Sequence, residues 1–182
     1  MARVPYLDAD DLAPEHRDLL ARPIWLNRAL VNSPGALRAM NELAGFIRNK
    51  STLDGRLCEL AILQVGYLAK SPYEWSHHVQ IGKARGVSDD DIRAIGEETG
   101  GKPTKLDETA KLVLRGAREM AEGLAMTEPT YKALEPKLGH AHMIDLVMTI
   151  SFYCAVVRIL ATLQIDVEPE YQKYLDEHPL PV

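Results

Sequence analysis

Helix start and stop signals recur along this chain, while no stretch alternates polar and apolar residues as a half-buried strand would. Ser33-Pro34 and Ser71-Pro72 each place a capping hydroxyl before a proline, which is typical of a helix N-terminus. Gly86 and Gly139 stand where the apolar periodicity ends, as helix C-caps do. The pattern predicts helices over residues 34–48, 51–69, 72–86, 88–96, 104–123, 128–139 and 140–164. We therefore predict an all-α domain of seven or eight helices joined by short loops.

The last predicted helix contains the most apolar part of the chain, residues 143–163, which also carries Asp145 and Arg158. A transmembrane helix needs about 20 residues with few charges, so we predict a buried central helix and no membrane partner. A helix that is apolar on nearly every face is covered all round, within one subunit or between subunits. We therefore expect a homo-oligomer. Arg158 needs a partner in such a helix, and Glu59, Glu74 or a residue across a subunit interface are the candidates.

Composition places the chain among ordinary globular domains. Its 182 residues are 46% hydrophobic and 26% charged, which suffices for a core. The net charge of -5 is spread along the chain and no basic stripe with interleaved aromatics occurs, so we predict no nucleic-acid partner. Two distant cysteines, Cys58 and Cys154, and an N-terminus without an apolar signal core favour a cytoplasmic location.

Residues 1–32 follow a looser pattern that contains Pro5, Pro14 and Pro23. We predict that they form an N-terminal arm, which could wrap a neighbouring subunit. Residues 33–182 are predicted to form the helical domain itself.

The helix predicted to begin at Pro72 carries the residues best suited to chemistry. Ser71, Glu74 and His78 are spaced i, i+3 and i+7 and so share one face. A carboxylate four residues before an imidazole can hold the ring and raise its pKa, which suits a general acid near neutral pH. The free N–H groups around Tyr73 and Glu74 at the helix N-terminus favour an anionic substrate group.

The same residues also have a purely structural interpretation. Ser71 and Glu74 have the spacing of a capping box, which needs no catalysis. Of His77 and His78, one could be exposed and the other packed, without either binding a ligand. Trp75 is expected in the core or in a pocket wall. Both interpretations hold together only if Glu74 is shared between the cap and a substrate.

Glu59 lies in an apolar run, so it is either exposed on the outer face or buried with a partner, where its pKa would be perturbed. Measured from Ser71, Glu59 lies about 18 Å away along an ideal helix and His78 about 10 Å away. In a plain antiparallel hairpin the two would miss each other by about two turns. An extended link near Lys70, a tilt or a third helix must close that gap.

The segment from Glu59 to His78 resembles the active-site signature of the carboxymuconolactone decarboxylase family, which includes alkylhydroperoxidase-like proteins. Peroxidase members have a Glu, eleven residues, a Cys-x-x-Cys, three residues and a His. Glu59 and His78 match the two ends, while Ser71 and Glu74 stand where the cysteines would be. Decarboxylase members also lack the cysteines and have Glu-x-x-x-His, as this chain does. The continuation from Gly86 to Ile92 is similar too, and the resemblance is strongest over about residues 53–95.

The resemblance implies an all-helical, alkylhydroperoxidase-like bundle assembled as a homo-oligomer, whether a trimer, a hexamer or a dimer. It favours a cofactor-free, metal-free lyase acting on a small, anionic carboxylate or lactone. Loss of carbon dioxide leaves an electron-rich carbon that must be protonated, and His78 is predicted to supply the proton, with Glu74 orienting it and Glu59 completing the relay. The predicted substrate-binding residues are Ser71, Tyr73, Trp75 and His77.

A hydrolase or hydratase could use the same acid–base pair to activate water, and nothing in the sequence separates that reaction from decarboxylation. Two functions of other classes also stay open at this point. A thiol peroxidase or other antioxidant protein needs a cysteine of low pKa with a resolving partner, and neither Cys58 nor Cys154 stands at a motif position. A non-catalytic oligomeric member of the fold is the other alternative, and a closed, dry site would support it. His140, His142 and Asp145 suggest metal only loosely, and we interpret them as a surface cluster at a helix start.

Overall fold

Capping side chains begin four of the eight α-helices that the structure describes within residues 2–181. A side-chain oxygen accepts a hydrogen bond from a backbone N–H of the following first turn at four N-caps: Asp54, Ser71, Ser88 and Asp107. The helix predicted from Ser51 begins later, at Gly55, because Asp54 is its N-cap. Ser51 instead donates a hydrogen bond to Asp145 at 2.6 Å.

The computed structural model describes residues 2–181, and within this range it contains helices and no strand. The α-helices are α1 (Trp25–Leu30), α2 (Pro34–Asn49), α3 (Gly55–Leu68), α4 (Pro72–Ala84), α5 (Asp89–Thr99), α6 (Glu108–Glu122), α7 (Glu128–Leu163) and α8 (Gln172–Glu177). Three short 3-10 helices are η1 (Ala9–Asp11), η2 (Pro14–Leu20) and η3 (Pro169–Tyr171). The predicted all-α class is confirmed.

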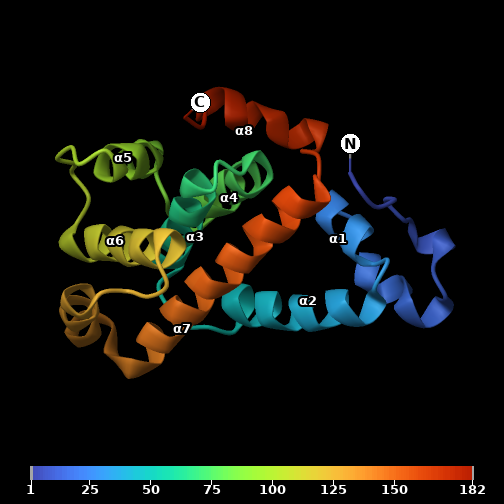
Figure 1. The fold of residues 1–182 in the computed structure, drawn as a ribbon, viewed down its shortest axis with the longest axis horizontal. Coiled ribbons are helices and arrows are strands. Elements are labelled where there is room, and N and C mark those ends of the chain that lie inside the picture. Colours follow the sequence, from blue (N-terminus) through green and yellow to red (C-terminus); the bar gives the residue numbers. More distant parts are fainter. Residues whose placement is uncertain (1, 182) are drawn as a thin grey trace.

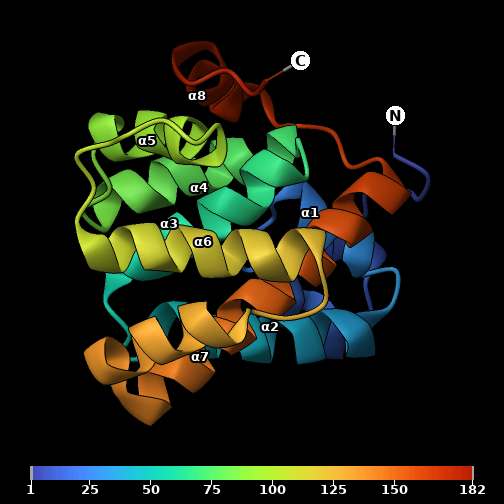
Figure 2. The same ribbon diagram turned by 60° about the vertical axis from the view of Figure 1, so that its left-hand side comes forward.

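The centre of the core is α3, not the last helix as the sequence predicted. Every residue of α3 from Leu57 to Gly66 is buried, and α3 packs against α4, α5, α6 and α7. Figure 2 shows α3 between α4 and α6, with α6 lying across the front of it. Because α3 is covered on all sides, any polar side chain on it must find a partner inside the protein.

Only one side of α7 is buried within the chain. Its inner face includes Met143, Leu146 and Ile150, while Ile144 is 64% exposed and Met148 is 40% exposed. By length and composition alone α7 could cross a membrane, but its inner face packs on α3 and α6. The apolar outer face agrees with the expectation of an oligomer, which stays a prediction, as does the absence of a membrane partner.

The predicted break between the last two helices is present at Gly139. Its φ of 73° and ψ of 166° are not helical, and they kink α7 between two helical stretches. The left-handed φ explains why glycine is suited to this position.

The N-terminal segment packs against its own chain in this structure. Its own small core contains Leu12, Leu19 and Leu20, and the backbone N–H of Arg3 donates to the carbonyl of Leu163 at 2.8 Å. Figure 1 shows this segment, in blue, beside the end of α7 from which the C-terminal segment continues. The division into an arm of residues 1–32 and a domain of residues 33–182 stays a prediction.

Candidate active site

The α3–α4 hairpin brings Glu59 and His78 together, although their distances from Ser71 suggested a mismatch of about two turns. The last residue of α3 is Leu68, and Lys70 then adopts a left-handed φ of 47°. The turn is closed by a hydrogen bond from the Ser71 N–H to a carbonyl of the last turn of α3. Glu59 is therefore about 14 Å from the end of α3, and His78 about 9 Å from the start of α4. The remaining offset is less than one turn, which a glutamate side chain spans.

His78 lies between two buried carboxylates. Its Nδ1 is 2.7 Å from Oε2 of Glu59, and its Nε2 is 3.0 Å from Oε1 of Glu74. Glu59, Glu74 and His78 are 0%, 3% and 5% exposed, so water does not compete for these contacts. Of the two possibilities left open for Glu59, burial with a partner is correct. We call the three residues the carboxylate–imidazole chain.

Arg85 balances the charge of Glu59. Its guanidinium lies 3.2 Å from Oε1 of Glu59 and also donates to the backbone carbonyl of Arg48. Sequence reasoning missed this residue, although a signal existed: Arg85 follows His78 by seven residues, about two helical turns, at the C-cap of α4. Because Glu59 is neutralised by Arg85, the imidazole can carry a proton shared with Glu74 without leaving a net buried charge.

Burial and the neighbouring charges shift the pKa values of His78 and Glu74 in the carboxylate–imidazole chain. Burial alone would lower the pKa of His78, but Glu59 and Glu74 outweigh it, and the pKa of the imidazole lies above its ordinary value. Burial also raises the pKa of Glu74; the negative charge of Glu59 adds to this, while His78 and Arg48 oppose it. The predicted rise for a histidine held by a carboxylate agrees with these directions.

We expect the imidazole of His78 to titrate above the ordinary histidine value of about 6.5. A histidine pKa that is raised on folding stabilises the protein in full below about 6.5 and loses this contribution as the pH rises through the folded pKa. Side-chain nitrogen NMR across the pH range measures it, and Glu59→Gln should lower the midpoint. A midpoint below the ordinary value in the wild type would contradict this assignment.

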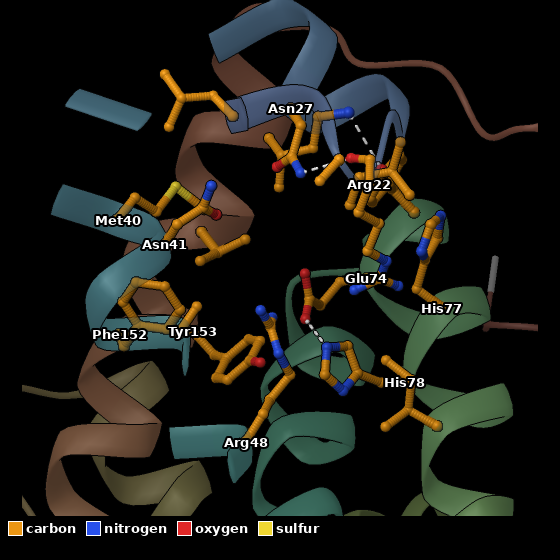
Figure 3. Close-up of a pocket in the computed structure, with 18 of the residues that line it drawn as sticks. Arg22, Asn27, Met40, Asn41, Arg48, Glu74, His77, His78, Phe152 and Tyr153 are labelled. Carbon is orange, nitrogen blue, oxygen red and sulfur yellow. Dashed lines mark hydrogen bonds and ion pairs between the residues drawn. The ribbon is translucent and has the colours of Figure 1, made fainter. Parts of the chain in front are cut away.

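A cavity of about 230 Å³ lies at the Glu74 end of the carboxylate–imidazole chain. Figure 3 shows Glu74, Arg48 and Tyr153 around the same space, with Arg22 reaching toward it from the N-terminal segment. Two buried polar atoms in it make no hydrogen bond within residues 2–181: the hydroxyl of Tyr153, and Oε1 of Glu74, which has only its 3.0 Å ion-pair contact to Nε2 of His78. Buried atoms of this kind mark a place where a ligand or water is bound.

His77 belongs to a second cluster, centred on Glu168. One carboxylate oxygen of Glu168 accepts from the backbone N–H of Trp25 at 2.7 Å and from the Tyr73 hydroxyl at 3.1 Å. The other lies 2.9 Å from Nε2 of His77, whose ring is stacked between Tyr73 and Tyr171. Burial lowers the pKa of His77. This cluster ties the N-terminal and C-terminal segments to α4.

Glu168→Ala is expected to lower the free energy of unfolding by about 3 kcal/mol, because three buried partners would lose a charged acceptor. Thermal or urea denaturation followed by circular dichroism measures the effect. Glu170→Ala, an exposed carboxylate of the same 3-10 turn, is the matched control. Equal stabilities of the two variants would show that the cluster does not hold the termini.

The predicted substrate-binding residues are divided by the structure. Tyr73 and His77 line the cavity, whereas Ser71 and Trp75 do not. The hydroxyl of Ser71 caps α4 through the N–H of Glu74, but the Glu74 side chain pairs with His78 instead of completing a capping box. The indole of Trp75 donates to the carbonyl of His178 at 2.6 Å, so this ring holds the C-terminal segment.

Other polar residues singled out in the sequence lie outside the cavity. Arg158 is exposed and donates to the carbonyl of Cys154, so its suggested pairing with Glu59 or Glu74 is wrong. His142 contacts Thr52 at 2.9 Å. In the described part of the chain, no group of three or more His, Cys, Asp or Glu side chains is arranged to hold a metal.

Neither cysteine is suited to thiol chemistry. Burial, together with the negative charge of Glu59, raises the pKa of the Cys58 thiol to about 11. Burial raises the pKa of Cys154 as well, and neither residue lines the cavity. A reactive thiol needs the opposite shift and access to its substrate.

Similarity to known proteins extends to a family model and to a solved structure. Residues 34–110 match the model described as the Carboxymuconolactone decarboxylase family. The crystal structure of an alkylhydroperoxidase AhpD core, an uncharacterized peroxidase-related protein from Ralstonia eutropha JMP134, is similar with a TM-score of 0.77 and 13% sequence identity. The alignment covers 99% of this chain and 98% of that chain. No curated protein matches the chain. The predicted resemblance and the alkylhydroperoxidase-like fold are thereby confirmed.

Proposed function

We propose that this chain, which resembles the carboxymuconolactone decarboxylase family and has an alkylhydroperoxidase-like fold, is a cofactor-free acid–base enzyme. Its substrate is a small anionic lactone or keto acid, and its reaction is decarboxylation. The observation that carries the proposal is the buried carboxylate–imidazole chain, which ends at a cavity lined by Glu74 and by the Tyr153 hydroxyl, an atom without a hydrogen bond within residues 2–181. A buried acid of raised pKa in a cavity is suited to proton transfer.

In this proposal the substrate first loses carbon dioxide. The electron pair of the breaking carbon–carbon bond stays on the substrate as an enolate. The carbon then takes a proton from the protonated carboxyl group of Glu74. The imidazolium of His78 returns a proton to Glu74, and Glu59 with Arg85 stabilises the charge of the ring. His78 finally takes up a proton from solvent, which restores the carboxylate–imidazole chain.

The roles differ in one respect from those predicted from the sequence, where His78 protonates the substrate directly. Both ring nitrogens of His78 face carboxylates, so neither is directed at the cavity. Glu74 is therefore proposed as the group that touches the substrate. His78 is a positioning and relay residue that acts through Glu74.

The alternatives have less support. A thiol peroxidase has no cysteine at the cavity, and the raised pKa of Cys58 works against it. A non-catalytic module fits a closed, dry site, whereas this cavity holds the buried Tyr153 hydroxyl, which has no hydrogen-bond partner in the described residues. Assembly into a homo-oligomer and a cytoplasmic location are kept as predictions.

A screen for carbon dioxide release tests the proposal. Small lactone acids and keto acids are incubated with the wild type and with His78→Gln, and the products are followed by NMR. We expect release from at least one acid and its loss in the variant. Release that persists in His78→Gln, or none from the whole series, would contradict the proposed function.

A further inference from the structure

Arg48 is a cavity residue whose charge is unpaired within residues 2–181 and has no role in the proposed reaction; Arg22, exposed at the rim, is another cavity arginine without an ion pair there. It lies in the last turn of α2, and its side chain lines the cavity. Its backbone carbonyl accepts a hydrogen bond from Arg85, which fixes this part of α2 against α4. Within residues 2–181, its guanidinium makes no hydrogen bond and no ion pair. Arg48 is half-buried, and a guanidinium that lies beside a buried carboxylate without a protein partner of its own is well placed to bind an anion.

Tyr153 faces the same space from α7. This residue of α7 is 2% exposed, and its hydroxyl has no hydrogen-bond partner in the described chain. Its ring packs edge-on against His78, with centroids 4.9 Å apart. Figure 3 shows the Tyr153 ring and the Arg48 guanidinium on the same side of the cavity, next to Glu74. A phenol and a guanidinium together supply the donors that a carboxylate accepts.

We propose that Arg48 and Tyr153 bind the carboxylate of the substrate and make the enzyme specific for small carboxylates. This inference rests on the proposed function, because it assumes that the bound carboxylate is the substrate of an enzyme. The cavity of about 230 Å³ is smaller than the pockets of about 300–1,000 Å³ that hold drug-sized ligands. The ligand is therefore a compact carboxylate that reaches both donors and Glu74 at once.

Charge balance couples this binding site to the acid. The groups that face Glu74 are Arg48 from α2, Glu59 from α3, His78 from α4 and Tyr153 from α7. In the empty site Arg48 opposes protonation of both Glu74 and His78. A carboxylate bound to Arg48 cancels that effect, so binding the anion and holding the catalytic proton favour each other. When Arg48 binds the substrate carboxylate, it therefore positions the substrate and also favours protonation of Glu74.

The other charged groups near the site do not change the conclusion that anion binding and protonation of Glu74 favour each other. Arg85 is paired with Glu59, and Arg22 adds further positive charge from the N-terminal segment, close enough to lower the pKa of His77. Asp18, at the cavity rim, is paired with Arg38. The cavity is therefore positive on balance when Glu74 is protonated.

A binding experiment tests the proposal without any turnover. The probes are γ-butyrolactone-γ-carboxylate and its uncharged carboxamide, which have the same shape, and titration calorimetry measures both. We expect the wild type to prefer the carboxylate by about tenfold or more, as a charged hydrogen bond of 1.5–3 kcal/mol implies. Arg48→Gln should abolish the preference, Arg48→Lys should keep part of it, and Lys50→Gln, an exposed charge nearby, should leave it unchanged.

Tyr153→Phe is the second variant, in case Arg48→Gln does not fold, and it should weaken carboxylate binding severalfold while carboxamide binding stays the same. Glu74→Gln should bind the carboxylate more tightly than the wild type above neutral pH, because a repelling charge is gone. In the wild type, the affinity for the carboxylate should fall by up to about tenfold per unit of rising pH as the carboxylate–imidazole chain loses its proton.

The outcomes separate the two proposals. Equal binding of carboxylate and carboxamide, no binding of either probe, or an Arg48→Gln variant that keeps the preference would overturn the role of Arg48. If both probes bind as expected but no acid of the screen releases carbon dioxide, the carboxylate-binding role of Arg48 and Tyr153 stands and the proposed decarboxylation is wrong.

Discussion

Glu74→Gln is expected to lower the rate of carbon dioxide release by about a hundredfold to ten-thousandfold, the usual contribution of a general acid. The amide keeps the shape of the side chain and can still contact His78, but it cannot donate a proton to a carbanion. The maximal rate at saturating substrate is the quantity to measure, because substrate binding should be retained.

Two controls make this result specific. Glu128→Gln makes the same chemical change at an exposed carboxylate on α7 and should behave as the wild type. The stability of Glu74→Gln should equal or exceed that of the wild type, because burial of a carboxylate raises its pKa at a cost to folding. A variant with near-normal maximal rate would remove Glu74 from the reaction.

Glu59→Gln should have the largest effect on stability. This side chain is fully buried and holds both Arg85 and His78. Breaking a buried ion pair from one side leaves an uncompensated charge and costs about 3 kcal/mol or more. For a chain of this size that corresponds to a melting temperature lower by roughly 6–12 °C. Urea denaturation at neutral pH gives the free energy directly.

A double-mutant cycle shows whether the loss comes from the pair. Arg85→Met removes the partner of Glu59, and the double variant should be more stable than the sum of the two single losses predicts. Strict additivity would mean that Glu59 is held by His78 alone.

The sequence predicted the helices well because capping residues act within a few positions of themselves. Ser88 and Asp107 begin α5 and α6 through contacts to the following turn, and Gly139 breaks α7 through its own backbone conformation. Burial was harder to predict, because it depends on partners that are distant in the chain. An apolar stretch of α7 was predicted to be central, yet α3 with its polar Glu59 occupies the centre.

Part of the site was predictable for the same reason. Glu74 and His78 are one helical turn apart, so their pairing follows from sequence spacing alone. The approach of Glu59 depended on where α3 ends, and the left-handed conformation of Lys70 is not visible in the residue type. Arg48 and Tyr153 join the site from α2 and α7, and only the packing of these helices places them there.

Solvent deuterium exchange measures the central claim most directly, because it reports proton transfer at carbon without requiring a complete reaction. γ-Butyrolactone-γ-carboxylate is held in deuterated buffer with the protein, and NMR follows the hydrogens next to its lactone carbonyl, whose removal gives an enolate. The wild type should speed their exchange above the buffer rate, and both Glu74→Gln and His78→Gln should lose about a hundredfold of it. Exchange no faster than in buffer, or undiminished in Glu74→Gln, would show that the buried chain moves no proton to a ligand in this cavity.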